Sequence, residues 1–224
     1  MSNEKKKPNT ERRTPKESPK LNIELNDEQK EFVKTFYDYD VSFLHGDFGC
    51  GKTVTAVYCA LTAFNKRQYD NVWITRPMLK NNLGALPGDI MEKLAPYTFP
   101  VQQNLEVCQG KPATDKMYAE GYLKIMPVEV AKGVTFINSV VIVDEYQDMD
   151  YVDFRTIITR LGVDSKIIFC GSEEQIDPRL GNNSCIYKTK QLENTGLVGF
   201  KTLTSNHRNP ILTDIINFLE KDLK

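Results

Sequence analysis

The segment Gly46–Thr53 carries glycines, a lysine and a threonine at a spacing that can hold phosphate groups. Its sequence, G-D-F-G-C-G-K-T, matches G-x-x-x-x-G-K-[ST] at every fixed position. The glycines let successive backbone N–H groups point at phosphates, and a helix N-terminus adds its positive end. In this pattern Lys52 reaches the β- and γ-phosphates and the Thr53 hydroxyl binds Mg²⁺. The predicted nucleotide-binding residues are therefore Gly46, Asp47, Phe48, Gly49, Cys50, Gly51, Lys52 and Thr53.

Two adjacent carboxylates, Asp144 and Glu145, follow the apolar run Val140–Val143. In open α/β sheets the ligand lies at the carboxyl ends of the strands, so these side chains are expected beside the phosphates. Asp144 would hold Mg²⁺, and Glu145 would accept the proton of an attacking water. With Lys52, Glu145 is a predicted catalytic residue of nucleotide hydrolysis. A chance glycine-rich turn and an ordinary acidic strand end are the alternatives.

Short apolar runs alternate with longer amphipathic segments, which predicts an α/β domain: a mostly parallel sheet with helices on both faces. The phosphate-binding pattern follows one such run and precedes a helix that begins near Lys52. Apolar residues at helical spacing, Phe154, Ile157, Ile158 and Leu161, predict a buried helix that stops at Gly162. A second buried stripe is predicted at Ile211, Leu212, Ile215, Ile216 and Leu219. The predicted strands are Val41–Leu44, Val72–Thr75, Tyr122–Met126, Val140–Val143, Lys166–Cys170 and Leu197–Leu203.

A long connection, about residues 77–120, separates the second and third predicted strands. Connections of that length have helices of their own or a function, so we expect a helical insertion there. Arg76, Lys80, Tyr97 and Phe99 are candidate contacts to nucleic acid, by phosphate pairing and base stacking. Burial in the core is the favoured alternative for the two aromatic residues.

Composition narrows the class of protein further. Hydrophobic residues make up 40% and charged residues 26% of the 224 residues, as in soluble globular domains. No apolar run approaches the roughly 18 residues of a membrane span, and no apolar segment follows Lys5–Lys7 as in a signal peptide. The five cysteines form no C-x-x-C pair, which argues against a disulfide framework or a zinc ribbon and favours a reducing compartment. These features predict a cytoplasmic protein that makes no membrane contact.

Charge is distributed unevenly along the chain. Residues 1–20 hold seven Lys/Arg and three Glu, a net charge of +4, so the other 204 residues carry −5 of the total of −1. The segment 1–20 has no aliphatic or aromatic residue after Met1 and is predicted to be a disordered basic tail. It would hold nucleic acid through phosphate contacts, or it is simply a solvated leader. The rest, residues 21–224, is predicted to be one domain.

Several motifs together resemble the PhoH-like ATPases. They are Leu83–Asp89, Glu92-Lys93, Pro96-Tyr97, Val128–Val130, Asp144-Glu145 and Thr159–Gly162 through Ser165-Lys166. Gln29, the phosphate loop, Thr75–Pro77, Asp144–Asp148, Gly171–Gln175 and Asn206–Arg208 also resemble the first motor domain of superfamily 1 helicases. The resemblance implies a single RecA-like P-loop domain with an insertion at about 77–120. It also implies ATP hydrolysis coupled to RNA or single-stranded DNA.

The resemblance implies roles for further residues. Gln29 is similar to the glutamine that reads adenine, and Gln147 and Gln175 to residues that sense the γ-phosphate, with Gln175 among the catalytic residues. Arg208 resembles an arginine finger, which stabilises the transferring phosphoryl group. Ordinary surface positions are the alternatives for the three glutamines, and a surface ion pair is the alternative for Arg208.

The chain also departs from both families. Ser172 stands where PhoH-like proteins commonly have Asp, and Lys132–Thr135 replaces an arginine-rich segment, which weakens the expectation of nucleic-acid contact there. One motor domain is present where a superfamily 1 helicase uses two, so movement along a strand by a lone monomer is not expected. A homo-oligomer, such as a ring-shaped hexamer, is implied instead. A nucleoside kinase and a nucleotide-gated binding module are the alternative functions.

Overall fold

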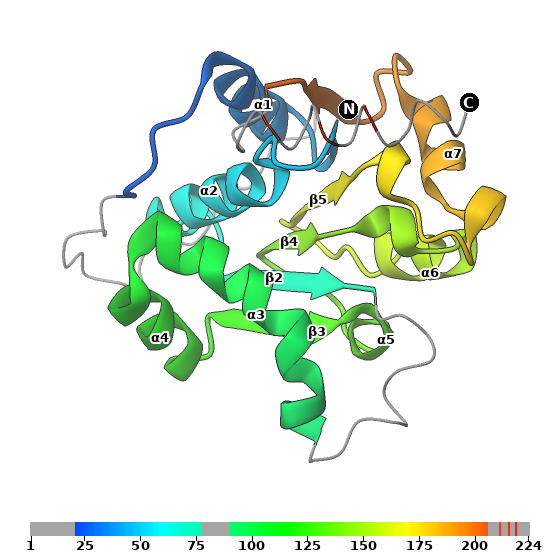
Figure 1. Cartoon of the computed structure of the whole chain (residues 1–224). Coiled ribbons are helices and arrows are strands. Elements are labelled where there is room, and N and C mark those ends of the chain that lie inside the picture. The colour runs from blue at the N-terminus through cyan, green and yellow to red at the C-terminus, as the bar shows by residue number, and fades with distance from the viewer. Residues whose placement is uncertain (1–20, 78–89, 206–210, 212–214, 216–217, 219–224) are drawn as a thin grey trace, which may run out of the picture.

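The computed structural model describes residues 21–77, 90–205, 211, 215 and 218, with side chains omitted for 90–98. Within these residues six strands form one parallel sheet in the order β3-β2-β4-β5-β1-β6 (Figure 1). This order places β5 between the strand that leads into the phosphate loop and the strand that leads into Asp144. The strands are β1 Val41–Gly46, β2 Asn71–Arg76, β3 Leu123–Pro127, β4 Ser139–Val143, β5 Lys166–Gly171 and β6 Gly199–Leu203.

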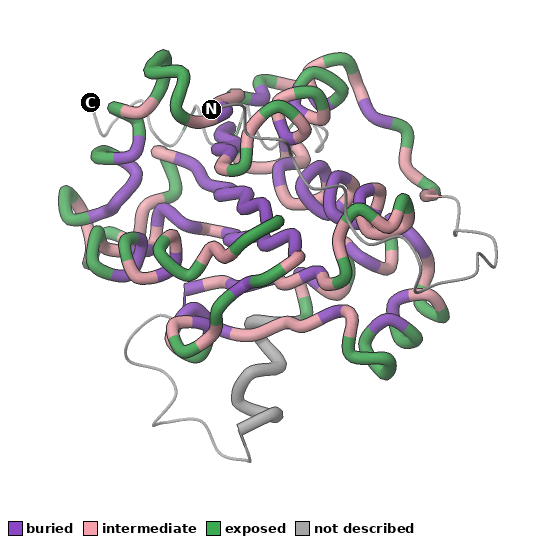
Figure 2. Tube along the Cα trace, turned by 180° about the vertical axis from the view of Figure 1, so that it is seen from behind, coloured by how far each residue is buried: buried purple, intermediate pink, exposed green. Residues whose placement is uncertain are grey.

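Burial explains why the strands are visible in the sequence. Every residue of β4 and β5 is buried, because helices cover both faces of a parallel sheet and its central strands are therefore continuously apolar. Figure 2 shows these buried strands running through the centre of the molecule. All six predicted strands are confirmed, with ends that differ by one or two residues.

Helices pack on both faces of the sheet, as predicted. On one face α1 Asp27–Asp38, α2 Lys52–Asn65, α3 Ile90–Gln109 and α4 Lys111–Ala119 share a core with Leu44, Ile142 and Ile168. On the other face α5 Val128–Ala131, α6 Tyr151–Ile158 and α7 Ile186–Thr189 share a second core with Phe43 and Phe169. Successive strand residues alternate between the two cores, since side chains in a strand point to opposite faces.

Aromatic rings fill much of the second core. The Phe43 ring of β1 is fully buried and stacks on Phe169 of β5, with 5.1 Å between ring centroids. Phe200 of β6 stacks on the same ring at 5.7 Å. Tyr146 and Phe154 pack against the same ring at 5.6 and 6.3 Å. This cluster joins β1, β5 and β6 to the segment that follows β4, and so it fixes the relative positions of the two predicted chemical motifs.

The helical insertion is confirmed over residues 90–119, where α3 and α4 pack on each other and on α2 or β3. A stripe of buried residues on α3, Val101, Leu105 and Cys108, attaches the insertion to the first core. Phe99 is 59% exposed, so its expected burial is wrong. Because it stands at a different angle around the helix from this stripe, it points away from the core.

Two other expectations about helices need correction. Helix α6 ends at Ile158, before Leu161, which pairs with Phe136 in an isolated bridge and still packs on the second core. Ile211 and Ile215 are 52% and 48% exposed, whereas the stripe they belong to is predicted to lie in the core. Leu212, Ile216, Leu219, the tail 1–20, Lys80 and Arg208 lie outside the described residues, as does the side chain of Tyr97. Among the described helices, none is long and apolar enough to cross a membrane.

Candidate nucleotide site

The phosphate-loop segment links the carboxyl end of β1 to the first turn of α2. Gly51 stands at the N-cap of α2 with φ 84°, a left-handed conformation that glycine adopts without the cost that a Cβ imposes. A Cβ on Gly46 would lie 2.5 Å from the backbone oxygen of Leu203, so no larger residue fits where the loop leaves the sheet. Two of the glycines thus have a steric cause in this chain: Gly46 packs closely against the backbone of β6, and Gly51 adopts a left-handed turn.

A cavity of about 310 Å³ lies over this loop. The N-terminus of α2 lies at this cavity, and the backbone N–H groups of a helix's first turn, together with the helix dipole, attract anions. The lining residues come from the loop, from α2, from the insertion and from the segments that follow β4 and β5: Phe48, Gly49, Gly51, Lys52, Thr53, Val54, Asn104, Glu145 and Gln175.

Lys52 lines this cavity while its ammonium group is bonded to the loop itself. Its Nζ donates to the backbone oxygens of Gly46 at 2.6 Å and Asp47 at 2.9 Å. The side chain is 9% exposed, so these two acceptors stabilise a charge that would otherwise be buried without partners. A phosphate in the cavity would offer charged oxygens, which are stronger acceptors for an ammonium group than the neutral carbonyls are.

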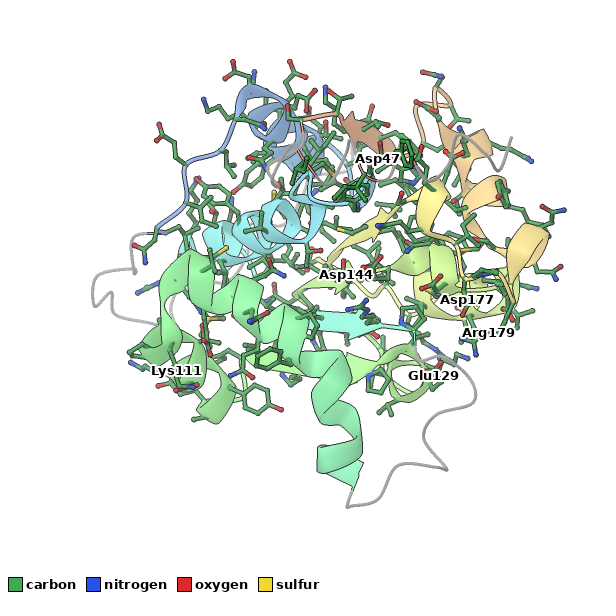
Figure 3. The ribbon with its side chains drawn as sticks, in the orientation of Figure 1. Asp47, Lys111, Glu129, Asp144, Asp177 and Arg179 are labelled. Carbon is green, nitrogen blue, oxygen red and sulfur yellow. The ribbon has the colours of Figure 1, made fainter. Side chains whose placement is uncertain are left out.

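Thr53 and Asp144 meet across the site. The Thr53 hydroxyl donates to Asp144 Oδ1 at 2.9 Å, although 91 residues separate them. Asp144 is 4% exposed, and burial, together with the neighbouring charge of Glu145, raises the pKa of its carboxyl group to about 6. Figure 3 shows Asp144 near the middle of the molecule, whereas Asp177 and Arg179 lie side by side towards its edge. Because burial raises the pKa of Asp144, a cation bound beside it would stabilise its ionised form.

Glu145 leaves the sheet in a left-handed conformation, with φ 53° and ψ 40°. This conformation is uncommon for a residue with a Cβ, and it separates two side chains that are neighbours in sequence. Asp144 contacts Thr53, whereas Glu145 lines the cavity and also accepts from Arg76 Nη2 at 3.3 Å and from Gln147 Nε2 at 2.7 Å. The two carboxylates can therefore have separate tasks.

A buried polar chain lies behind the phosphate loop. His45, the residue before Gly46, hydrogen-bonds through Nε2 to the Tyr146 hydroxyl, which also lies 3.1 Å from the Thr189 hydroxyl on α7. Burial is the main cause that lowers the pKa of His45 to about 4; the charge of Glu173 opposes this shift, and the positive charges of Lys190 and Lys52 add to it. His45 is thus a neutral imidazole at physiological pH, and it links the loop to the residue after Glu145.

The other predicted site residues lie at different distances from the cavity. Gln175 is exposed and lines it, whereas Gln147 is 1% exposed and contacts Glu145 instead. Gln29 completes a capping box at the start of α1, where its Oε1 accepts from the Asn26 backbone at 3.0 Å. Asp47, labelled in Figure 3, is an exposed loop residue, and Cys50 is buried, which raises the pKa of its thiol. The roles assigned to these residues remain predictions.

Sequence reasoning missed two features of the site. Asn104, from the insertion, lines the cavity, and its Nδ2 donates to the backbone oxygen of Pro100 at 2.9 Å. Asn104 lies three residues after Val101, beside the buried stripe of α3. A polar residue next to an apolar helix stripe was the sequence signal that could have identified it. For Arg76 the sequence suggested only a contact to nucleic acid, and its pairing with Glu145 joins residues 69 apart that no pattern connects.

The parallel sheet, the loop between β1 and α2, and the paired acids after β4 define a P-loop nucleotide-binding domain with a RecA-like fold. The chain belongs to the PhoH-like protein family, whose sequence profile matches residues 23–220. It is 32% identical over 199 residues to a PhoH-like protein of Bacillus subtilis and 34% identical over 185 residues to protein PhoH of Escherichia coli K12. These matches cover 86% and 78% of this chain.

The chain spans 62% and 52% of the length of those two relatives. Among solved structures, the large terminase of a thermophilic bacteriophage is similar, with a TM-score of 0.54 at 12% identity. That similarity covers 87% of this chain and 50% of the terminase chain. At this identity it shows the shared fold alone.

Proposed function

We propose that this chain hydrolyses ATP with Mg²⁺ and couples that reaction to RNA or single-stranded DNA. One observation carries the ATPase proposal: the Thr53 hydroxyl meets the Asp144 carboxylate at 2.9 Å, beside a cavity that Thr53 lines together with Lys52 and Glu145. The required groups for phosphoryl transfer thus converge from the ends of two strands. Membership of the PhoH-like family, and the resemblance to a helicase motor domain, support the coupling to nucleic acid.

The oxygen atoms of Thr53 and Asp144 fit a magnesium ion. Mg²⁺ prefers oxygen ligands in octahedral geometry at about 2.0–2.1 Å, so adjacent ligands lie about 2.9 Å apart, and it commonly takes only one or two ligands from the protein. In the described part of the chain no group of three or more His, Cys, Asp and Glu could hold a metal, which is consistent with a site completed by phosphates and water. When bound there, Mg²⁺ would neutralise charge on the β- and γ-phosphates.

The chain's own residues divide the remaining work. Backbone N–H groups of the loop and of the first turn of α2 hold the phosphates. The Lys52 ammonium group exchanges its hydrogen bonds to the loop carbonyls for hydrogen bonds to the phosphate oxygens. Glu145, which also lines the cavity, directs a water at the γ-phosphate and accepts its proton. Gln147 holds one oxygen of Glu145 at 2.7 Å, so that the other oxygen can face the water.

The test compares phosphate release and ATP binding in four proteins: wild type, Lys52→Ala, Glu145→Gln and Glu193→Gln. Lys52→Ala should weaken ATP binding, because it removes the ammonium group. Glu145→Gln should bind ATP normally and lose turnover by about 10²-fold or more, the usual contribution of a general base. Glu193 is exposed and does not line the cavity, so Glu193→Gln controls for the loss of one negative charge.

Three outcomes would reject the proposal in different ways. Equal turnover in wild type, Lys52→Ala and Glu145→Gln would show that this site does not hydrolyse ATP. No phosphate release from wild type with Mg²⁺ and nucleic acid would indicate a binding module. Phosphorylated product from a panel of nucleosides would indicate a kinase. Mass measurement on the same sample tests the ring-shaped homo-oligomer, for which a hexamer is the expected result.

A further inference from the structure

The ion pair between Arg76 and Glu145 has no role in the mechanism above. Arg76 Nη2 lies 3.3 Å from Glu145 Oε1, while Gln147 Nε2 lies 2.7 Å from Oε2, so each oxygen of the carboxylate already accepts a hydrogen bond from the protein. A general base needs an oxygen that faces its water. In this arrangement the guanidinium group competes with the water for Oε1, which opposes hydrolysis.

The two partners of Glu145 are held with different strengths. Gln147 is 1% exposed, and its Oε1 accepts from the backbone N–H of Ser172 at 3.2 Å, so its amide is fixed in the core. The Arg76 side chain is 29% exposed and makes a single, longer contact to Glu145, which is itself 27% exposed. Partly exposed ion pairs of this kind are weak. Arg76 is therefore the partner that another ligand can remove.

The position of Arg76 favours a ligand other than the nucleotide. Arg76 is the last residue of β2, at the carboxyl edge of the sheet, and it is absent from the lining of the nucleotide cavity. A guanidinium group binds phosphate oxygens through two parallel hydrogen bonds, which is a better geometry than its one contact to Glu145. A phosphodiester outside the cavity can thus compete for Arg76 while ATP occupies the loop.

We propose that Arg76 is a positioning residue that restrains Glu145, and that a phosphodiester group of RNA or single-stranded DNA draws Arg76 away and frees Glu145 to activate water. Nucleic acid then accelerates hydrolysis without entering the nucleotide cavity. This proposal rests on the proposed function of Glu145. Nucleic-acid binding and ATP hydrolysis are then coupled through one side chain, because Arg76 contacts either the Glu145 carboxylate or the nucleic acid.

The experiment measures kcat and KM for ATP in wild type, Arg76→Gln, Arg76→Lys and Arg179→Gln. Each protein is assayed alone, with an oligouridine RNA, with an oligothymidine DNA, and with heparin as a polyanion without bases. Arg179→Gln is the matched control, because it breaks an exposed arginine–carboxylate pair, with Asp177 at 2.6 Å, outside the nucleotide cavity.

In Arg76→Gln, kcat without nucleic acid should rise to the value that wild type reaches with saturating nucleic acid, and nucleic acid should accelerate it no further. KM for ATP should stay unchanged, since Arg76 does not line the cavity. Arg76→Lys keeps the charge without the planar fork, and it should respond to nucleic acid less than wild type does. Arg179→Gln should behave as wild type in every arm.

Several results would overturn the proposal. An Arg76→Gln protein whose basal kcat is unchanged or lower, or which nucleic acid still accelerates as it does wild type, excludes the restraint. Wild type that neither oligonucleotide accelerates excludes the coupling, and equal acceleration by heparin assigns it to polyanions in general. If Arg76→Gln does not fold, a normal response of Arg76→Lys rejects the proposal. Normal turnover of Glu145→Gln would instead reject the proposed function itself.

Discussion

Acidification should destabilise the folded protein through His45. Burial lowers the pKa of this imidazole from 6.5 to about 4. The unfolded chain therefore binds the proton more strongly than the folded protein, and stability falls as the pH drops through this window. Well above pH 6.5 neither state is protonated and His45 has no effect, whereas well below pH 4 both states are protonated and its full effect has been reached.

The size of the effect follows from the two pKa values. Between about pH 7 and about pH 5, His45 should lower the free energy of unfolding by about 2 kcal/mol, and its complete shift corresponds to about 3 kcal/mol. Other groups also titrate. Burial raises the pKa of Asp144, so acidification changes the free energy of unfolding in the opposite direction through this group. Hydrogen bonds from Thr204 and Ser205 lower the pKa of Glu28 to about 2, so its contribution to stability is lost only in stronger acid. A single curve of stability against pH therefore mixes several terms.

Urea unfolding of wild type and His45→Gln, at the two pH values and without Mg²⁺ or nucleotide, separates His45 from the carboxylates. Both proteins contain the same carboxylates, so the difference between their pH dependences isolates the imidazole. Wild type should lose about 2 kcal/mol more than His45→Gln between about pH 7 and about pH 5. His207→Gln, which removes the other histidine of the chain, is the control.

Parallel pH dependences in wild type and His45→Gln would refute this reasoning. They would show that His45 is protonated as easily in the folded protein as in the unfolded chain, and hence that its site is not sealed from water. An NMR titration of the two imidazoles gives an independent reading. One of them should titrate well below the ordinary value of 6.5.

Two smaller substitutions test the packing around the site. Gly171→Ala places a Cβ 2.6 Å from the Tyr146 ring and 2.9 Å from Gln147 Oε1, so it should lower the free energy of unfolding in urea by about 1–3 kcal/mol and lower turnover by displacing Gln147. Gly133→Ala, whose Cβ meets nothing closer than 3.7 Å, is the control. Equal stability of the two variants contradicts the prediction. Gln29→Ala removes one arm of the α1 capping box and should cost about 1 kcal/mol, whereas Gln29→Glu retains an acceptor and should cost less; equal losses would remove the capping role.

Much of the fold was predictable because it depends on local pattern. The central strands are buried on both faces, so they appear as apolar runs whatever surrounds them. The insertion between β2 and β3 was predictable as helical from the length of the connection. The end of α6 was not, because Leu161 packs on the same core from beyond the helix and so continues its apolar spacing.

The phosphate loop and the two acids after β4 can be recognised from the amino-acid sequence alone. Their chemistry depends on residue type and on short spacing: Gly51 adopts the left-handed turn that starts α2, and Lys52 and Thr53 stand in its first turn. These are properties of a few consecutive residues, so they can be read without knowledge of the rest of the chain.

Which groups meet at that loop depends instead on contacts between distant parts of the chain. Thr53 reaches Asp144, Arg76 reaches Glu145, and His45 reaches Tyr146 across separations of 69 to 101 residues. The left-handed turn at Glu145, which separates its side chain from that of Asp144, has no sequence signal, because glycine is the usual residue in that conformation. Sheet order and packing set these contacts, and with them the surroundings of Glu145, the proposed base.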